Sequence, residues 1–106
     1  MYLPLVTGTL AATDTATSVP AGEVWMIYSI TLNQPAASAA NTVSLAIGGT
    51  SLTAGNVRKI YSLAAGLATL NDYPGIAVAA GSSVNISATT AAQTTFTING
   101  FKFKTV

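Results

Sequence analysis

The chain has 106 residues and a formal net charge of +1, and only 7% of its residues are charged. An ordinary globular domain carries charge on roughly a quarter of its residues. The chain also contains no His and no Cys, which excludes the usual proton shuttles, thiol nucleophiles and transition-metal sites. Because charge keeps free proteins soluble and apart, we expect another protein, or further copies of this chain, to cover part of the surface.

The length predicts a single domain over residues 1–106. No stretch approaches the roughly 20 apolar residues of a membrane span, and no basic region follows Met1 as in a signal peptide. The net charge is too small to predict binding to nucleic acid, which needs several phosphate contacts. We therefore expect a protein made in the cytoplasm, with no membrane or nucleic-acid partner.

The N-terminal segment, residues 1–7, is apolar: Tyr2, Leu3, Leu5 and Val6 lie close together in it. Such a segment is either an edge strand of its own domain or an arm that reaches onto a neighbouring molecule. Residues 7–18, rich in Thr and Ala, also suit an edge strand.

Four short segments share the order apolar residue, any residue, Ala, Gly. We interpret each as a strand end followed by a tight turn, in which Gly supplies a positive φ. The four segments are Val19–Gly22, Leu52–Gly55, Leu63–Gly66 and Val78–Gly81.

Residues 24–32 give the strongest strand signal, because every even position is apolar. Trp25 and Ile27 fall on the opposite face of this strand. Two interpretations stay open for them. The strand is buried on both faces, with Trp25 in a sandwich core, or Trp25 and Ile27 form an exposed strip that meets another chain, since Trp is enriched in binding hot spots.

Further strands are predicted over residues 42–47, 57–63, 76–79 and 84–89. The strand 57–63 carries Arg58 and Lys59, which face opposite ways because neighbouring strand residues alternate. They are interpreted as solvated residues that protect a sheet edge; the alternative is that one of them bridges to an acidic neighbouring subunit.

The closing segment, residues 94–104, has two interpretations. Asn99-Gly100 between alternating apolar residues is typical of a two-residue hairpin turn. The alternative is one long strand with a bulge at Asn99-Gly100.

A long loop is expected at residues 34–40, and Tyr73 lies in a second turn, Asp72–Gly75. Seven to nine short strands with turns about every ten residues predict an all-β fold, an antiparallel β-sandwich of the jelly-roll or immunoglobulin-like kind.

Little catalytic chemistry is available to this chain. The carboxylates Asp14, Glu23 and Asp72 are far apart in sequence, and each is interpreted as a solvated turn residue. Ser and Thr nucleophiles need a base, no Gly-rich run forms a phosphate loop, and metal ligands are scarce. We therefore expect a protein that is not an enzyme and has no cofactor, cofactor-binding residue or metal.

The segment Ser18–Asn33 resembles small virion proteins of tailed bacteriophages, which show a Val-Pro-Ala-Gly turn followed by a long apolar strand. A strand like 41–47, a late Ala-Gly turn within 78–86 and a closing strand like 96–103 complete the resemblance. It implies a β-sandwich capsid cement or decoration protein that binds the major capsid protein, often as a homotrimer, and is located in the virion. It also implies one continuous last strand, which favours the bulge.

The interface candidates that follow from these considerations are Tyr2, Leu3, Leu5, Trp25, Ile27, Arg58 and Tyr73. Two other function classes stay open. Tyr73 and Asn71 on a loop would suit a tail, fibre or head-fibre module that binds a receptor or carbohydrate. A small depolymerase would depend on Asp72 or Glu23.

Overall fold

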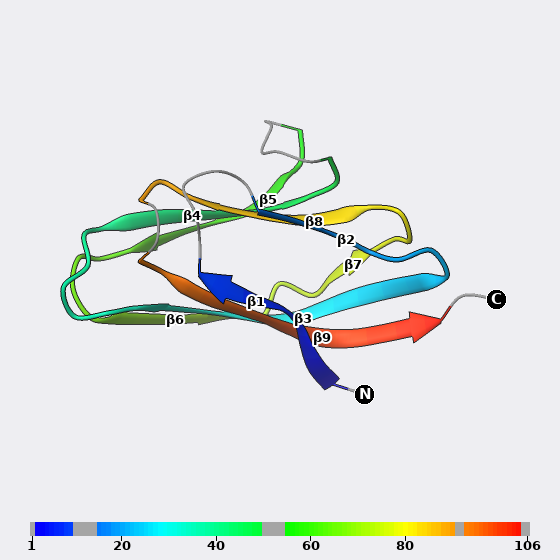
Figure 1. The fold of residues 1–106 in the computed structure, drawn as a ribbon, viewed down its shortest axis with the longest axis horizontal. Helices are drawn as coiled ribbons and strands as arrows, with labels where there is room; N and C mark the ends of the chain where they lie inside the picture. The colour runs from blue at the N-terminus through cyan, green and yellow to red at the C-terminus, as the bar shows by residue number, and fades with distance from the viewer. Residues whose placement is uncertain (1, 10–14, 50–54, 91–92, 105–106) are drawn as a thin grey trace.

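The computed structural model describes residues 2–9, 15–49, 55–90 and 93–104 of the chain. Within these ranges it contains nine strands and no helix, arranged as two antiparallel sheets stacked on each other (Figure 1). The predicted all-β sandwich is therefore confirmed. Among the described residues, no helix is present that is long and apolar enough to cross a membrane.

The first sheet, called sheet A here, has the strand order β1-β9-β3-β6, with the short strand β7 also paired to β3. The second, sheet B, has the order β2-β8-β4-β5. The strands of sheet A are β1 (Tyr2–Thr9), β9 (Thr95–Lys104), β3 (Glu23–Gln34), β6 (Ala68–Asp72) and β7 (Ile76–Val78). The strands of sheet B are β2 (Thr15–Ser18), β8 (Ser83–Ala88), β4 (Asn41–Ile47) and β5 (Val57–Leu63).

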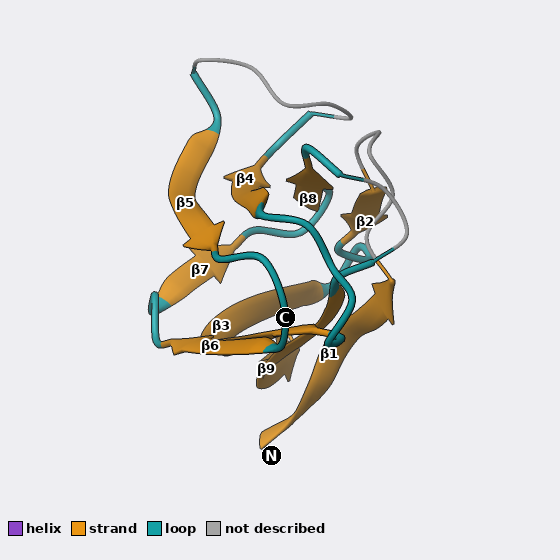
Figure 2. Cartoon of the chain, turned by 90° about the vertical axis from the view of Figure 1, so that its left-hand side faces the viewer, coloured by secondary structure: helices purple, strands orange, loops and turns teal. Residues whose placement is uncertain are grey.

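The pairing follows that of a jelly roll. The first strand pairs with the last, β2 with β8, β3 with β6, and β4 with β5. The chain therefore behaves as one long two-stranded ribbon, rolled so that its inner strands come together in two layers. Figure 2, viewed along the strands, shows sheet B above sheet A with the core between them.

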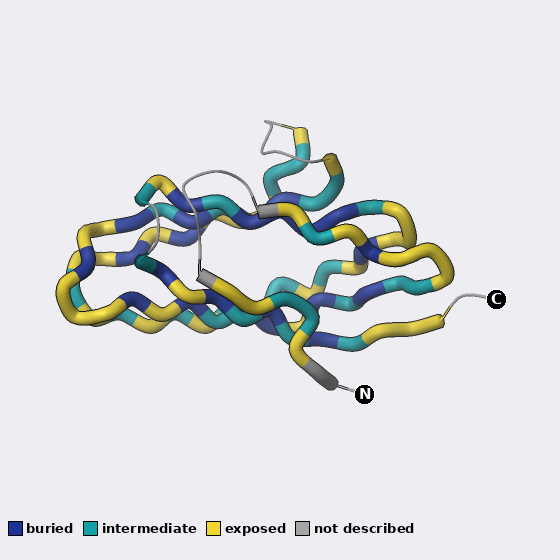
Figure 3. The backbone as a smooth tube through the Cα atoms, in the orientation of Figure 1, coloured by how far each residue is buried: buried dark blue, intermediate teal, exposed yellow. Residues whose placement is uncertain are grey.

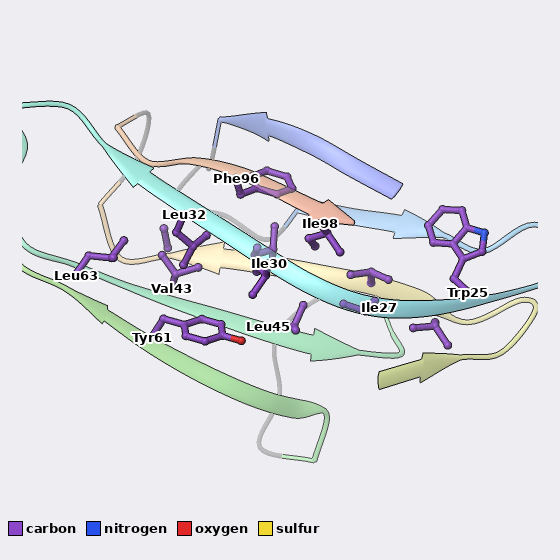
Figure 4. Packing of buried hydrophobic residues seen from close by; sticks show 14 of the residues in the cluster. Trp25, Ile27, Ile30, Leu32, Val43, Leu45, Tyr61, Leu63, Phe96 and Ile98 are labelled. Atoms are coloured by element: carbon purple, nitrogen blue, oxygen red, sulfur yellow. The ribbon is translucent and has the colours of Figure 1, made fainter. Parts of the chain in front are cut away.

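The core lies between the two sheets and is made of medium-sized apolar side chains. Figure 3 shows buried residues alternating with less buried ones along much of β3, β4 and β9, as expected when one face of a strand is packed and the other is more open to solvent. In Figure 4, Trp25 lies at one end of the cluster. The buried cluster consists of Val19, Trp25, Ile27, Ile30, Leu32, Val43, Leu45, Tyr61, Leu63, Val78, Val84, Ile86, Ala88, Phe96 and Ile98.

Most of the predicted glycine turns are present. Gly22, Gly66 and Gly81 have φ values of 83°, 87° and 79°, and Gly75 has 63°. These left-handed conformations are open to Gly at little cost. Of the fourth predicted turn, residues 52–54 lie outside the described residues.

The last strand is continuous, so the hairpin interpretation of Asn99-Gly100 is wrong. The irregularity lies instead on its neighbours. Tyr28 is an extra residue on β3, between the pairs Ile27–Gly100 and Ser29–Asn99. On the other side, Leu5 is an extra residue on β1. The bulge predicted within β9 is therefore replaced by two bulges that flank it.

The close approach of β3 to β9 explains why position 100 of β9 is a glycine. A Cβ atom added there would lie 1.9 Å from the carbonyl oxygen of Met26 and 3.1 Å from a methyl group of Leu5. The backbone of β3 approaches β9 too closely for any side chain, which is a common reason for Gly within a strand.

The predicted loop at residues 34–40 contributes to a buried hydrogen-bond network at one end of the sandwich. Asn41 Nδ2 donates to Thr94 Oγ1 at 2.7 Å, and Asn41 Oδ1 accepts from the Thr90 backbone N–H at 2.9 Å. Gln34 Oε1 accepts from Thr94 Oγ1 and from Gln93 Nε2. These bonds tie the β3–β4 and β8–β9 connections together and satisfy side chains that would be costly to bury alone.

Candidate functional site

The bulge at Tyr28 decides which side chains of β3 face outward. Before the bulge Trp25 and Ile27 point into the core, and after it Ile30 and Leu32 do so. One extra residue reverses the alternation of a strand. The apolar even positions in the first half of β3 therefore lie on the outer face of sheet A, whereas those in the second half lie in the core.

Four aromatic rings gather on this outer face. Tyr28 contacts Tyr73 edge to face, with ring centroids 5.7 Å apart, and contacts Phe101 in the same manner at 6.3 Å. Phe101 and Phe103 are stacked at 6.4 Å. Tyr28, Tyr73 and Phe103 are 50%, 66% and 54% exposed. We call Tyr28, Tyr73, Phe101 and Phe103 the aromatic cluster; Met26 and Val24 lie beside it at the register of Phe101 and Phe103.

On the described strands of sheet A, every charged side chain points away from this outer face. Lys102 alternates with Phe101 and Phe103, and its Nζ lies 5.0 Å from the centroid of the Trp25 ring on the core side. Glu23 accepts a hydrogen bond of 2.9 Å from Trp25 Nε1. Asp72 turns inward and accepts one from Tyr61. Lys104 is two residues after Lys102, on the same side of β9, and is paired in register with Glu23. The outer face is therefore free of charge along the described strands.

The other half of the same face carries neutral polar residues in register. Thr31 is paired with Thr97 on β9 and with Asn71 on β6, and Thr31 Oγ1 donates to Asn71 Oδ1 at 2.7 Å. One position pair along, Thr69 Oγ1 donates to Asn33 Oδ1 at 3.0 Å. The outer face is thus aromatic at one end and hydroxyl- and amide-lined at the other.

The prediction that Trp25 and Ile27 form an exposed interface strip is wrong. They are 4% and 0% exposed and belong to the core cluster. The core interpretation holds for both, because β7 covers this part of β3 on one edge and sheet B covers the core face. The exposed apolar strip that was considered for them exists on the opposite face of the same strand.

The N-terminal candidates lie on β1, the edge strand of sheet A. Tyr2 is at the register of Phe101 and Leu3 at that of Gly100. Leu5 and Val6 are partly buried and pack against the core. The edge-strand interpretation of residues 1–7 therefore holds for the described residues from position 2 onward, and the free-arm interpretation does not.

Arg58 and Lys59 lie on β5, the edge strand of sheet B. Arg58 is exposed and is the extra residue of a bulge opposite Leu45 and Ala46. Lys59 Nζ is 4.0 Å from Asp72 Oδ2, with both side chains partly exposed, so this ion pair adds little to stability. Charge and a bulge are both ways of keeping a sheet edge from pairing with another chain.

Asp72 is not the solvated turn residue that was expected. It ends β6, and its Oδ2 accepts a hydrogen bond of 2.7 Å from the Tyr61 hydroxyl. That bond is the main cause that lowers the pKa of Asp72 below its usual value. Burial, together with the same bond, raises the pKa of Tyr61. A carboxyl group with a lowered pKa and a phenol with a raised pKa are poor proton carriers near neutral pH. The hydrogen bond between Tyr61 and Asp72 instead joins β5 to β6.

No other grouping of described side chains offers catalytic or metal chemistry. Glu23 is bonded to Trp25, and Asp14 lies outside the described residues. Within the described ranges, no three acidic, His or Cys side chains come together as metal ligands, and no pocket opens on the surface. The candidate site is therefore a broad face for contact, with no cleft.

The sequence alone indicates Tyr73 as a surface residue, but not Tyr28, Phe101 or Phe103. The signal for the two Phe residues was their alternation with Lys102 and Lys104. If the lysines are taken as solvated, the Phe residues look buried, whereas Lys102 in fact folds over Trp25 on the inner side. Tyr28 was hidden by the bulge, which the pattern of a regular strand does not reveal.

Comparisons with known proteins show the fold alone. No family model matches the chain, and no curated protein does. Among solved structures, the chain is similar to the core of Drosophila NLP, a structure described in connection with pentamer formation and histone binding. The TM-score is 0.57 and the identity 20%, over 96% of this chain and 100% of that one.

Two larger proteins show a weaker likeness. One is the Podospora anserina GH26-CBM35 β-(1,4)-mannanase, with a TM-score of 0.45, 10% identity, and coverage of 95% of this chain and 28% of that one. The other is an acetyl xylan esterase from Butyrivibrio proteoclasticus, with a TM-score of 0.45, 14% identity, and coverage of 100% and 34%. Likenesses of this size carry no argument about function.

Proposed function

We propose that this chain is a bacteriophage capsid cement or decoration protein, which binds between major capsid subunits and stabilises the shell. The observation that carries the proposal is the charge-free outer face of sheet A with its aromatic cluster. Large exposed aromatic patches are rare on free proteins and are typical of surfaces that meet another protein. The resemblance of Ser18–Asn33 to small virion proteins supplies the viral setting.

The mechanism is that of a rigid staple. A small sandwich does not deform when a junction between subunits is strained, so it resists separation of the subunits that it bridges. Each copy contributes little, but many copies bound at equivalent positions act together on one shell. The proposed role is non-catalytic and requires no cofactor, nucleic acid or membrane.

The test is to locate the chain on intact particles of the phage that encodes it. Gold-labelled antibody fragments against the recombinant chain are imaged by electron microscopy. Label over the whole head is the expected result. Label on the tail or at one vertex, or no label with an antibody shown to reach the chain in opened particles, contradicts the proposal.

A tail, fibre or head-fibre module for carbohydrate binding is the second candidate, because Tyr73 and Asn71 lie on the outer face together with Tyr28. Sugar rings stack on the flat faces of aromatic side chains. The edge-to-face contact of Tyr28 with Tyr73, at an interplanar angle of 65°, breaks up a flat stacking platform. Measurable glycan binding that disappears in Tyr73→Ala would favour this candidate over the decoration role.

A further inference from the structure

We propose that the outer face of sheet A is an interface between two copies of this chain, packed face to face about a two-fold axis. The inference rests on the proposed function only in that both take this face to be adhesive. One face cannot hold two occupants at once, so a dimer would have to separate before the face could meet a capsid subunit. The inference names the occupant: a second copy, with the aromatic clusters and the polar rows of both chains inside the contact.

Charge is the first argument. A partner surface must match a face that carries neither positive nor negative side chains along the described strands. Burying an unpaired charge of a partner against such a face would be costly. A second copy brings the same neutral face, so the match needs no partner charge at all. The four charged residues on the described strands of sheet A, Glu23, Asp72, Lys102 and Lys104, are on the other side of their strands and stay outside the contact.

Side chains in the polar half of the face are already hydrogen-bonded to one another, which is the second argument. Thr31 Oγ1 is bonded to Asn71 Oδ1 at 2.7 Å, and Thr69 Oγ1 to Asn33 Oδ1 at 3.0 Å. Polar groups that already have a partner within their own chain lose less when water is removed. This half therefore lowers the desolvation penalty of the contact, whereas the aromatic cluster supplies its apolar area.

Area is the third argument. Ten residues of β9 at about 3.3 Å each, across four strands about 4.8 Å apart, give a face of about 600 Å². A standard stable interface uses roughly 800 Å² on each partner. The face, with the side chains at its margins, is therefore close to the area that a stable dimer needs.

Symmetry is the fourth argument. A two-fold interface joins one patch to the same patch on the partner, whereas a ring of three joins two different patches. The exposed β5 edge of sheet B carries Arg58 and Lys59, so it offers no neutral counterpart to the outer face of sheet A. A two-fold dimer uses the outer face of sheet A alone and needs no second patch, whereas the trimer that the resemblance to virion proteins implies would need one.

The first test is the mass of the full chain in solution. Sedimentation equilibrium is measured from about 1 μM to about 1 mM, and a particle of twice the 10.7 kDa chain mass is expected at the upper end. Tyr28→Lys brings an unpaired charge from each copy into the neutral contact, so we expect dimerisation to weaken at least about 100-fold, since an unpaired charge is costly to bury.

The matched control is Ile60→Lys. Ile60 is 64% exposed on β5 of sheet B, and the substitution adds the same charge to a similarly exposed strand residue. The dimer is expected to keep its wild-type strength in this variant. Thermal unfolding of both variants checks that they remain folded.

A second measurement leaves the centre of the contact unchanged. The chain has no Cys, so single spin labels are introduced through Thr7→Cys on β1, the edge strand of sheet A, and through Ser62→Cys on sheet B. Stacked sheets lie about 10 Å apart, so three sheet spacings, about 30 Å, separate the two Ser62 strands, whereas one spacing separates the planes of the two sheets that carry Thr7. The Thr7 distance is therefore expected to be the shorter.

Four outcomes would overturn the inference: a monomer throughout the concentration range, a trimeric mass, equal weakening by Ile60→Lys, or a shorter Ser62 distance. A monomer that binds a glycan through Tyr28 would assign the face to carbohydrate instead. The result is separate from the imaging of virions, because a dimer missing from particles would refute only the decoration role, and a monomer found on heads would refute only this inference.

Discussion

Trp25 is the residue whose place in the structure differs most from what the composition suggested. A single Trp in a charge-poor chain suggested a binding hot spot. The ring, however, is 4% exposed, donates a hydrogen bond to Glu23 and is covered by the Lys102 ammonium group. The Nζ of Lys102 lies over the ring, 5.0 Å from its centroid, which is a favourable cation–π contact. The residue therefore closes one end of the core.

Trp25→Ala is expected to lower the free energy of unfolding by about 3–5 kcal/mol, as large-to-small core substitutions do. Chemical denaturation of the purified chain measures this. Trp25→Phe, which keeps most of the ring volume, serves as the control and should cost clearly less. An unchanged stability in Trp25→Ala, with attachment to a partner lost, would instead restore Trp25 as an interface residue.

Tyr61 and Asp72 form the pair whose protonation links stability to pH. The lowered pKa of Asp72 means that its contribution is present above the ordinary carboxyl range and is lost as the pH falls through the lowered value. The raised pKa of Tyr61 means that its contribution is complete below the ordinary value of 10.0 and is lost as the pH rises above it.

Tyr61→Phe removes the hydroxyl that couples the two groups. The melting temperature of the wild type is expected to fall both in acid and above about pH 10, since the unfolded tyrosine then releases its proton first. The variant should show a smaller fall at both ends. Parallel melting curves for wild type and variant across pH 2–11 would count against the coupling.

At the scale of elements, β9 is held between two neighbours that both bulge beside it. The extra residues Tyr28 and Leu5 are on opposite sides of Asn99 and Gly100. Gly100 permits the approach of the Met26 carbonyl on one of these sides. This local crowding places the apolar half of β3 on the outer face, so the candidate site depends on a glycine that does not belong to it.

Gly100→Ala is expected to cost about 3 kcal/mol or more, because a Cβ would collide with backbone that cannot rotate away. Gly8→Ala on β1 is the matched control: its Cβ would meet the Phe96 ring at 3.4 Å, near ordinary contact. Denaturation with urea compares the two. Equal stabilities of both variants would show that the crowding at Gly100 relaxes freely.

The elements also show where sequence patterns succeed. The strand predicted over residues 57–63 coincides with β5, since branched residues and bounding turns mark it on both sides. β6 was missed, because Ala68–Asp72 mixes small, polar and charged residues. Its place is decided by pairing with β3 and by the Tyr61–Asp72 bond, both of which join residues distant in sequence.

The same limit applied to the candidate site. Period-two alternation predicts a face only as long as the register is unbroken, and the bulge at Tyr28 breaks it in the middle of β3. The sequence therefore predicted two apolar faces for β3 and left open whether Trp25 and Ile27 are in the core or form the exposed one. The structure places both in the core, and the outer face carries Met26 and Tyr28.

For the whole molecule, the first strand is what covers the β9 edge of sheet A. β1 covers the outer edge of β9, and Leu5 and Val6 add to the core. A deletion of residues 1–9 is expected to lower the melting temperature and to cause aggregation, because the freed edge of β9 can pair with another chain.

Thermal unfolding and gel filtration of the truncated chain measure both effects. A synthetic peptide of residues 1–9, added in excess, should restore the melting temperature by occupying the vacant edge. A truncated chain with the oligomeric state and melting temperature of the full chain would show that β1 neither stabilises sheet A nor protects the edge of β9.

The order of strands has a consequence for how the protein is made. β8 and β9 leave the ribosome after all the other described strands, yet each is an inner strand of its sheet, β8 between β2 and β4 and β9 between β1 and β3. At typical rates of about 5–20 residues per second, synthesis of the chain takes about 5–20 seconds. Before β8 and β9 are made, β3 can pair with β6 and β4 with β5, but β1 and β2 have no neighbour. The incomplete sheets also carry almost no charge to keep nascent chains apart, so the chain passes through its most aggregation-prone form before β9 is translated.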